Sequence, residues 1–284
     1  MPDATEELRE VLRRSPFRHR LRTVLHRWYA GYDAPTMPRQ YQGELVTDDF
    51  TIVRPPQFPV RTVTGRAAYL DSLTTAYTGH RNAHHLRGLE LTPDMSHATV
   101  THDFETIGPQ LTGTIRMRYD IDLVQDPAGR LPRFHRLTET ILGTDDTPFV
   151  DGYGENRVRA FIHYWLSLLE EPAATAAPLR ELISDELTPR LDEIATRTTA
   201  GLGTHHPADL RIDLADPENY RVTMDFEWVG IDASDRPRTA RTRHDWTLRE
   251  SGERYPRLHR YEAEVIEPPT PIPAEDALAR ALRN

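Results

Sequence analysis

The sequence contains one module twice, and this repeat limits how the chain can fold more than any other feature. The stretch RLPRFHR at 130–136 returns as RYPRLHR at 254–260. Earlier in each copy, LHRW at 25–28 matches IHYW at 162–165, which begins 137 residues later. Self-similarity over this length indicates a duplicated, domain-sized unit. The predicted divisions are residues 1–146, residues 147–267, and a Pro-rich spacer with a terminal helix at residues 268–284.

Within each copy, a helical pattern comes before a strand pattern. Apolar residues between Leu21 and Tyr32 recur on one helical face. Ser15 followed by Pro16 is typical of a helix start. Later segments alternate between apolar and polar side chains, as strands with one apolar face do. Each module is therefore predicted to be an α+β unit, in which a curved antiparallel sheet wraps around helices.

Composition excludes several classes of function. The formal net charge of −9 gives no basic footprint of the kind that nucleic-acid binding requires. The sequence has no cysteine and no lysine, which excludes thiolate and Schiff-base chemistry by its own side chains. The apolar runs are shorter than the roughly 20 residues of a membrane span, and the first residues do not resemble a signal peptide. We expect a cytoplasmic protein without a nucleic-acid or membrane partner.

The order of several stretches carries a resemblance to a known superfamily. LHRWYAGYD at 25–33 precedes ELVTDDFTIVRPP at 44–56, TVTGRAAYLDSL at 62–73, the pair His84-His85, and DPAGRLPRFHR at 126–136. This order resembles the nuclear-transport-factor-2-like superfamily, in particular SnoaL-like polyketide cyclases and the relatives of scytalone dehydratase and ketosteroid isomerase. The resemblance implies two tandem cystatin-like, cone-shaped barrels, each around an apolar pocket. It also implies that they pair as a pseudo-dimer within one chain, with a homodimer as a further arrangement.

Histidines supply the first catalytic candidates. His102 falls on the apolar strand face that should line the cone, where it is either a core histidine bonded to a neighbour or a general acid or base. His84 and His85 are adjacent and point to opposite strand faces, which disfavours a shared metal ion. Relatives of the dehydratase type have a histidine in this region, so we expect His85 to face the pocket. The alternative is a structural role at the start of the strand.

The end of the first helix supplies further candidates. Tyr29 and Asp33 lie beside the face of the helix that carries Trp28. The resemblance implies that Asp33 acts as a base at the pocket mouth and that Tyr29 or Tyr32 donates to a developing oxyanion. Solvated side chains are the alternative. The residues expected to bind substrate are Trp28, Tyr32, Phe104 and Tyr119. No cofactor and no metal is expected.

A set of charged residues recurs in both copies. Their alternation with Phe104 and Ile121 predicts a ladder of opposite charges on the outer face of the sheet. In the first copy these residues are Asp103, Glu105, Arg116, Arg118 and Asp120. A β-bulge would instead turn Asp120 inward, toward catalysis. The facing of His135 in the closing motif stays open.

These observations predict a small-molecule cyclase, dehydratase or isomerase of secondary metabolism. It would use cofactor-free acid/base chemistry in an apolar pocket, including ring closure by intramolecular displacement. The alternative is a non-catalytic protein that binds a hydrophobic metabolite, which needs the apolar cone but no titratable pair. Epoxide hydrolysis would need an Asp-Arg-Asp set inside the cone, which the strand alternation disfavours. The first copy is expected to have the better-equipped pocket, because the second has Met224 where the first has His102.

Overall fold

The chain divides into two compact units. The computed structural model describes residues 4–34, 39–58, 60–73, 80–108, 112–125, 131–171, 177–195 and 201–283. The first unit consists of residues 21–160, and the second unit of residues 1–20 and 161–284. The division falls within two helices, α1 (Ala4–Asp33) and α4 (Tyr153–Leu169), so each unit contains part of both. The predicted domain boundaries follow the repeat instead, and they stay a prediction.

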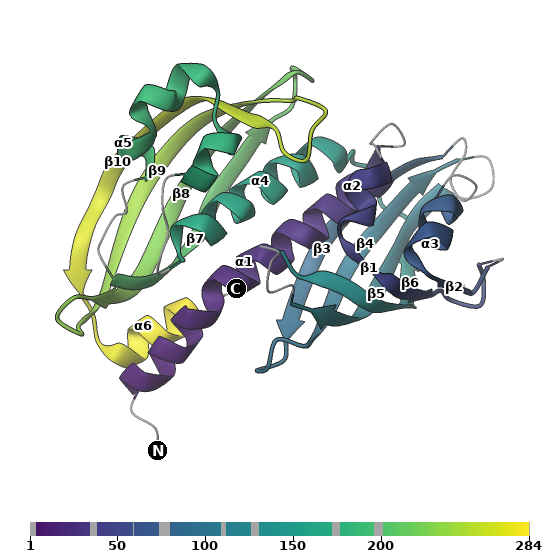
Figure 1. Ribbon diagram of the computed structural model, residues 1–284, viewed down its shortest axis with the longest axis horizontal. Helices are drawn as coiled ribbons and strands as arrows, with labels where there is room; N and C mark the ends of the chain where they lie inside the picture. Colours follow the sequence, from purple (N-terminus) through teal and green to yellow (C-terminus); the bar gives the residue numbers. More distant parts are fainter. Residues whose placement is uncertain are drawn as a thin grey trace. The chain divides into compact units, whose positions relative to one another are not determined.

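The first unit is built on a six-stranded sheet with the order β2-β1-β6-β5-β4-β3. Strand β1 runs parallel to β6, and the other neighbours are antiparallel. Figure 1 shows the short helix α3 against this sheet, where it packs on β1. The elements are α2 (Arg39–Gly43), β1 (Val46–Val53), β2 (Thr62–Thr64), α3 (Arg66–Ser72), β3 (Arg81–Leu91), β4 (His97–Ile107), β5 (Thr112–Val124) and β6 (Arg133–Asp145).

The second unit is built on a four-stranded antiparallel sheet with the order β10-β9-β8-β7. Its elements are η1 (Ala177–Leu182), η2 (Asp185–Arg190), α5 (Leu191–Ala195), β7 (Gly201–Asp213), β8 (Asn219–Asp232), β9 (Pro237–Arg249), β10 (Arg257–Pro271) and α6 (Ala274–Ala281). Strand β10 continues through part of the predicted spacer. The predicted terminal helix is α6, whose Ala277 and Ala281 share a buried cluster with Leu8 of α1 and Ile231 of β8.

Strand alternation decides which side chains face the core. On β4 and β5, His102, Phe104 and Ile121 are all buried. Arg116 and Arg118, on the other face, are 59% and 43% exposed. The predicted apolar inner face is therefore confirmed, and so is the α+β class with two tandem sheets.

Helix α1 begins earlier than the sequence pattern predicts. It starts at Ala4 and continues through Pro16, where a helix start was expected. Proline inside a helix costs about 3 kcal/mol, because it lacks an N–H and clashes with the preceding turn. Leu8 and Leu12 precede it and are fully buried, each contributing about 1.5–3 kcal/mol. Their burial outweighs the cost of the proline. Within the described residues, no helix is long and apolar enough to cross a membrane.

Candidate active site

A carboxylate and an imidazole meet inside the first unit, where α1 ends near β3. Asp33 is the last residue of α1, and its side chain is fully buried. His84 on β3 donates through Nδ1 to Asp33 Oδ1 at 2.6 Å, and its backbone N–H donates to Oδ2 at 3.3 Å. The carboxylate thus fixes both the ring position and the nitrogen that carries the proton. His84 Nε2 has no hydrogen-bond partner among the described residues.

Asn156, near the start of α4, holds this pair in place. Its Nδ2 donates to Asp33 Oδ2 and to the His84 carbonyl oxygen, both at 2.9 Å. Its Oδ1 accepts from His26 Nδ1 at 2.8 Å. Burial lowers the pKa of His26 to about 3, so this imidazole is neutral and donates an N–H. The four side chains form one buried polar chain.

Two opposing effects set the charge state of Asp33. Burial disfavours the carboxylate and raises its pKa, while the charge and hydrogen bond of His84 and the hydrogen bond of Asn156 lower it. The net direction of the pKa shift is upward.

Aromatic rings surround the His84 imidazole. Tyr29 stacks on it, with ring centroids 5.2 Å apart and planes 7° apart. The centroids of Phe104 and His102 lie 4.9 Å and 5.7 Å from that of His84. Tyr119 lies 4.2 Å from His102 by the same measure. The structure therefore gathers three of the predicted site residues around a histidine that was not predicted, and places a fourth, Tyr119, beside His102.

His102 and Tyr29 carry polar atoms that the fold leaves unsatisfied. Both ring nitrogens of His102 and the Tyr29 hydroxyl are buried without a hydrogen-bond partner among the described residues. Burial holds the pKa of His102 well below its usual range and that of Tyr29 well above, so both side chains are neutral. An unpaired buried polar group costs about 1–3 kcal/mol. Such a group calls for an explanation, and a bound molecule provides one.

A second polar cluster in the first unit consists of Tyr32, Arg54, Tyr69 and Glu139. The hydroxyls of Tyr32 and Tyr69 are hydrogen-bonded at 3.2 Å, and burial raises the pKa of Tyr32 to about 12. Burial also raises the pKa of Glu139 to about 7, although the charge of Arg54 opposes this shift. Glu139 pairs with Tyr119 across β6 and β5. Because Tyr119 contacts His102, the two clusters are neighbours.

His85, which was predicted to face the pocket, lies on the opposite face of β3. Its Nε2 is 3.1 Å from the carbonyl oxygen of Val150 and 3.6 Å from Glu105 Oε1. Adjacent strand residues point to opposite faces, and Asp33 binds His84 on the inner one. The facing predicted for His85 is therefore wrong, and His84 takes the inner position.

The predicted substrate-binding residues divide between the two clusters. Phe104 and Tyr119 contact the rings of His84 and His102. Trp28 stacks on Tyr69, with centroids 5.2 Å apart and planes 4° apart. The Tyr32 side chain is near both clusters: its hydroxyl is hydrogen-bonded to that of Tyr69, and its ring centroid lies 5.7 Å from that of His84. Trp28 is thus packed against the second cluster rather than against the histidines.

The charged ladder predicted for the outer face is confirmed. Asp103 accepts from Arg87 at 2.8 Å and from Arg116 at 3.1 Å. Arg118 donates to Asp120 at 3.0 Å, so Asp120 is held on the outer face and the β-bulge alternative is wrong.

In the closing motif, Phe134 is buried while His135 is 45% exposed and lies 3.3 Å from Asp49. The facing of His135, which the sequence left open, is therefore outward. The histidine pairs with a surface carboxylate and does not contribute to the inner clusters.

Besides His84, two further residues of the buried clusters, Asn156 and Glu139, were not predicted from the sequence. Alternation marks Glu139, because it lies two residues after the buried Leu137 and pairs with the inward-facing Tyr119. No local pattern marks Asn156, since its partners Asp33 and His84 lie 123 and 72 residues away in the sequence. Only the fold brings them together.

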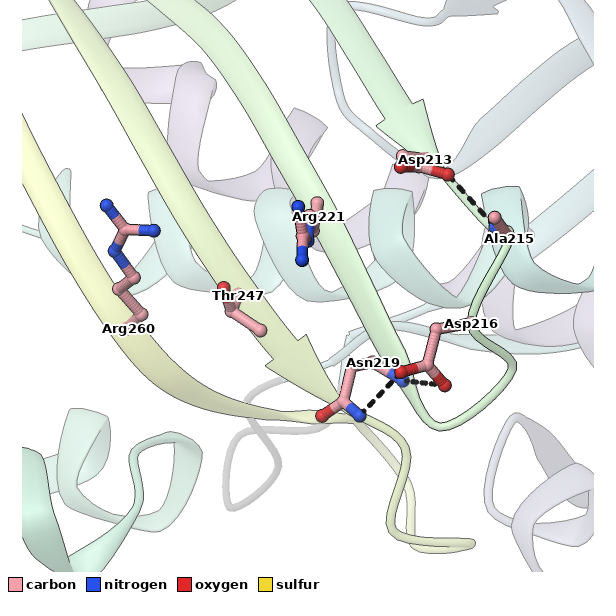
Figure 2. Close-up of a pocket in the computed structure, with 7 residues that line it drawn as sticks. All are labelled: Asp213, Ala215, Asp216, Asn219, Arg221, Thr247 and Arg260. Atoms are coloured by element: carbon pink, nitrogen blue, oxygen red, sulfur yellow. Dashed lines mark hydrogen bonds between the residues drawn. The ribbon is translucent and has the colours of Figure 1, made fainter.

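Two grooves lie on charged outer faces, away from the buried clusters. One, of about 530 Å³, is lined by ladder residues such as Asp103 and Arg116. The other, of about 600 Å³, is on the second unit and includes Asp216, Asn219 and Arg221 (Figure 2). Asp216 there accepts from Asn219 Nδ2 at 2.9 Å, so its carboxylate stabilises the turn between β7 and β8. In the described part of the chain, no group of three or more His, Asp or Glu residues is arranged to hold a metal ion.

Comparisons with known proteins found similarity to solved structures alone. No protein-family model and no curated protein matches the chain. Similar solved structures include a putative scytalone dehydratase from Novosphingobium aromaticivorans (18% identity, 45% of this chain and 86% of that one, TM-score 0.34). Others are nuclear transport factor 2 from Cryptosporidium parvum (12%, 44% and 94%, 0.36) and a putative polyketide cyclase from Sinorhizobium meliloti (13%, 41% and 93%, 0.32).

Proposed function

We propose that the first unit is an enzyme that moves protons on a small, largely apolar molecule, with His84 as the base. One observation carries the proposal. A buried carboxylate holds His84 Nδ1 at 2.6 Å, while His84 Nε2, the His102 ring and the Tyr29 hydroxyl have no partners among the described residues. A fixed base with hydrogen-bonding groups around the same position is the minimum set for acid/base catalysis.

In the first step, His84 Nε2 removes a proton from a carbon or hydroxyl of the substrate. When the proton comes from carbon, the electron pair moves onto a neighbouring substrate oxygen, and when it comes from a hydroxyl, the pair stays on that oxygen. Tyr29 and His102 donate hydrogen bonds to the oxygen that carries the charge. Asp33 stabilises the imidazolium that His84 becomes. In the second step, the proton leaves His84 for another substrate carbon or for a departing group, which takes the electrons of the broken bond. The proposed reaction needs no cofactor.

Isomerisation, dehydration and ring closure share this first step and differ in where the electron pair goes next. An isomerase returns the proton to another carbon, a dehydratase adds it to a departing hydroxide, and a cyclase uses the freed nucleophile to displace a leaving group. Glu139, whose pKa burial raises to about 7, is a second group able to supply a proton to a leaving group. The proposed class is therefore cyclase, dehydratase or isomerase.

Proton abstraction can be tested with 2-tetralone, an apolar ketone with acidic C–H bonds. Proton NMR in deuterium oxide measures how fast these positions exchange. We expect the wild-type protein to exceed the buffer rate, and His84→Gln or Asp33→Asn to lower the protein-catalysed rate about 100-fold or more. His85→Gln is the matched control, because it makes the same change at the adjacent residue on the outer face and should keep the wild-type rate.

Exchange at the buffer rate, or an equal loss in His84→Gln and His85→Gln, would contradict the role of His84 as base.

The second candidate function is non-catalytic binding of a hydrophobic metabolite. It is favoured by the stacked rings of Tyr29 and His84, which suit a flat ligand. Binding alone predicts that wild type and His84→Gln take up 2-tetralone with similar affinity and that neither exchanges its protons.

A further inference from the structure

The second unit contains a cavity of about 330 Å³, at the small end of the range for ligand sites. Aromatic and aliphatic side chains form most of its wall, among them Trp165, Leu169, Phe226 and Tyr261. Two histidines, His205 and His244, also line it. The cavity is therefore mostly apolar, with a few polar groups that can orient a ligand.

His205 belongs to a buried chain of polar side chains. Its Nδ1 donates to Glu170 Oε1 at 3.1 Å, and its backbone N–H donates to the same oxygen at 2.6 Å. His19 Nε2 lies 3.2 Å from this oxygen, and His19 Nδ1 is hydrogen-bonded to His163 Nδ1 at 3.0 Å. Three nitrogen atoms thus converge on one carboxylate oxygen beside the cavity.

This chain repeats the arrangement around Asp33 in the first unit. The repeat spacing of 137 residues relates Asp33 to Glu170 and His26 to His163. It relates Asn156 to His19 in the same way. In both units, a carboxylate at the end of a helix holds a strand histidine by its Nδ1 and by its backbone amide. The second unit therefore has the same pair of hydrogen bonds to position its strand histidine.

The charge of Glu170 keeps His205 in one orientation. Burial alone would raise the pKa of Glu170, but His19 and His205 outweigh burial and the net direction is downward. An ionised carboxylate is tolerated in a buried site only when donors face it, as they do here. Because His205 Nδ1 is directed at Glu170, Nε2 is the ring nitrogen left for a ligand, and it accepts a hydrogen bond when the ring carries a single proton.

The remaining polar groups of the wall indicate what kind of ligand fits. Burial lowers the pKa of His244 to about 3, so this ring is neutral, and its Nε2 is hydrogen-bonded to Thr242 Oγ1 at 2.9 Å. Glu193 and Glu264 also line the cavity, and none of its lining residues in the described part of the chain is an arginine. Glu193 is ion-paired with Arg190 at 2.6 Å, and Glu264 lies opposite Arg243 on the neighbouring strand, so both carboxylates are balanced by cations outside the wall. The described lining itself offers no cation to pair with an anionic ligand, which favours a neutral one.

We propose that this cavity is a second ligand site, distinct from the proton-transfer site of the first unit. Its ligand is a neutral aromatic molecule whose hydroxyl group donates a hydrogen bond to His205 Nε2. The aromatic wall supplies stacking surface, and its described residues include no arginine that would pair with an anion. The His205 ring nitrogen that faces away from Glu170 accepts the hydrogen bond from the ligand hydroxyl.

Isothermal titration calorimetry with 2-naphthol and 2-naphthoate tests this site. Both probes have the same ring system, and at neutral pH the first is neutral while the second is an anion. We expect the wild-type protein to bind 2-naphthol at least about tenfold more tightly. Ala263→Trp fills the cavity from an exposed position on β10 and should weaken 2-naphthol binding at least about tenfold. Ala215→Trp makes the same change in the outer groove of Figure 2 and should bind like wild type.

His205→Phe removes the acceptor while keeping a ring, and should weaken binding about fivefold, the effect of one hydrogen bond. Circular dichroism shows whether this variant folds, and if it does not, Ala263→Trp decides alone. Equal binding of the two probes, or equal affinities in Ala263→Trp and Ala215→Trp, overturns the proposal. The exchange assay with 2-tetralone addresses different residues, so either proposal can fail without the other.

Discussion

Three buried histidines of the first unit show how surroundings decide the role of one residue type. His26 is bonded to Asn156 and His84 to Asp33, whereas His102 has no partner among the described residues. Each of the first two has its Nδ1 hydrogen-bonded to a neighbouring side chain, which fixes the position of its ring. The third lowers the stability of the core, and such a side chain is typical of a functional position rather than a packing position.

Replacing His102 by leucine should therefore stabilise the protein. We expect His102→Leu to raise the free energy of unfolding by about 1–2 kcal/mol, because an unsatisfied buried imidazole gives way to an apolar side chain of similar size. The matched change His26→Leu should lower it by about 1–3 kcal/mol, because Asn156 Oδ1 loses its donor. Urea denaturation measures both values. A loss in His102→Leu as large as that in His26→Leu would mean that His102 supports the core.

Glu139 should give the first unit a pH dependence opposite to that of most carboxylates. Burial raises its pKa from the ordinary 4.5 to about 7, against the charge of Arg54. Between these values the folded protein holds a proton that the unfolded chain has released, so the stabilisation present below pH 4.5 is lost as the pH rises through 7. The loss amounts to at most about 3 kcal/mol. Urea denaturation near pH 5 and pH 8 should show a smaller fall in Glu139→Gln than in wild type, and equal falls would contradict the raised pKa.

At the scale of elements, the strands can be predicted from the local alternation of apolar and polar side chains, because each strand has one buried apolar face. Alternation alone places Phe104 and Ile121 inward and Arg116 outward, as the structure has them. In the segment around His84 and His85, the pattern gives opposite facings but not which histidine is inside. The apolar neighbours there are too few to fix the phase, and the missing information comes from Asp33 on another element.

For helix α1, contacts with distant parts of the chain determine the helix start more than the local sequence does. Ser15-Pro16 is a correct local signal for a helix start, yet burial of Leu8 and Leu12 against distant parts of the chain extends α1 back to Ala4. The candidate site divides in the same way. Asp33 was predicted from the helix end that carries it, and His102 from its strand. Asn156 was missed, because its role depends on contacts that no local window contains.

At the scale of the whole molecule, each unit builds its polar chain from both repeats. In the first unit, Asp33 and His84 belong to the first repeat and Asn156 to the second. In the second unit, Glu170 and His205 belong to the second repeat, whereas His19 belongs to the first. A single copy of the module therefore lacks one member of its own polar chain.

Because each polar chain contains residues from both repeats, a substitution in one repeat should impair the site whose carboxylate and strand histidine belong to the other repeat. Asn156→Leu should lower exchange of 2-tetralone about tenfold or more, because Asp33 loses a positioning hydrogen bond, and should leave 2-naphthol binding unchanged. His19→Leu should do the reverse, weakening 2-naphthol binding severalfold because the charge on Glu170 loses one of its two histidines. The two assays measure both variants side by side. If each substitution impaired only the site of its own repeat, the helix segments would not be shared in solution as they are in this fold.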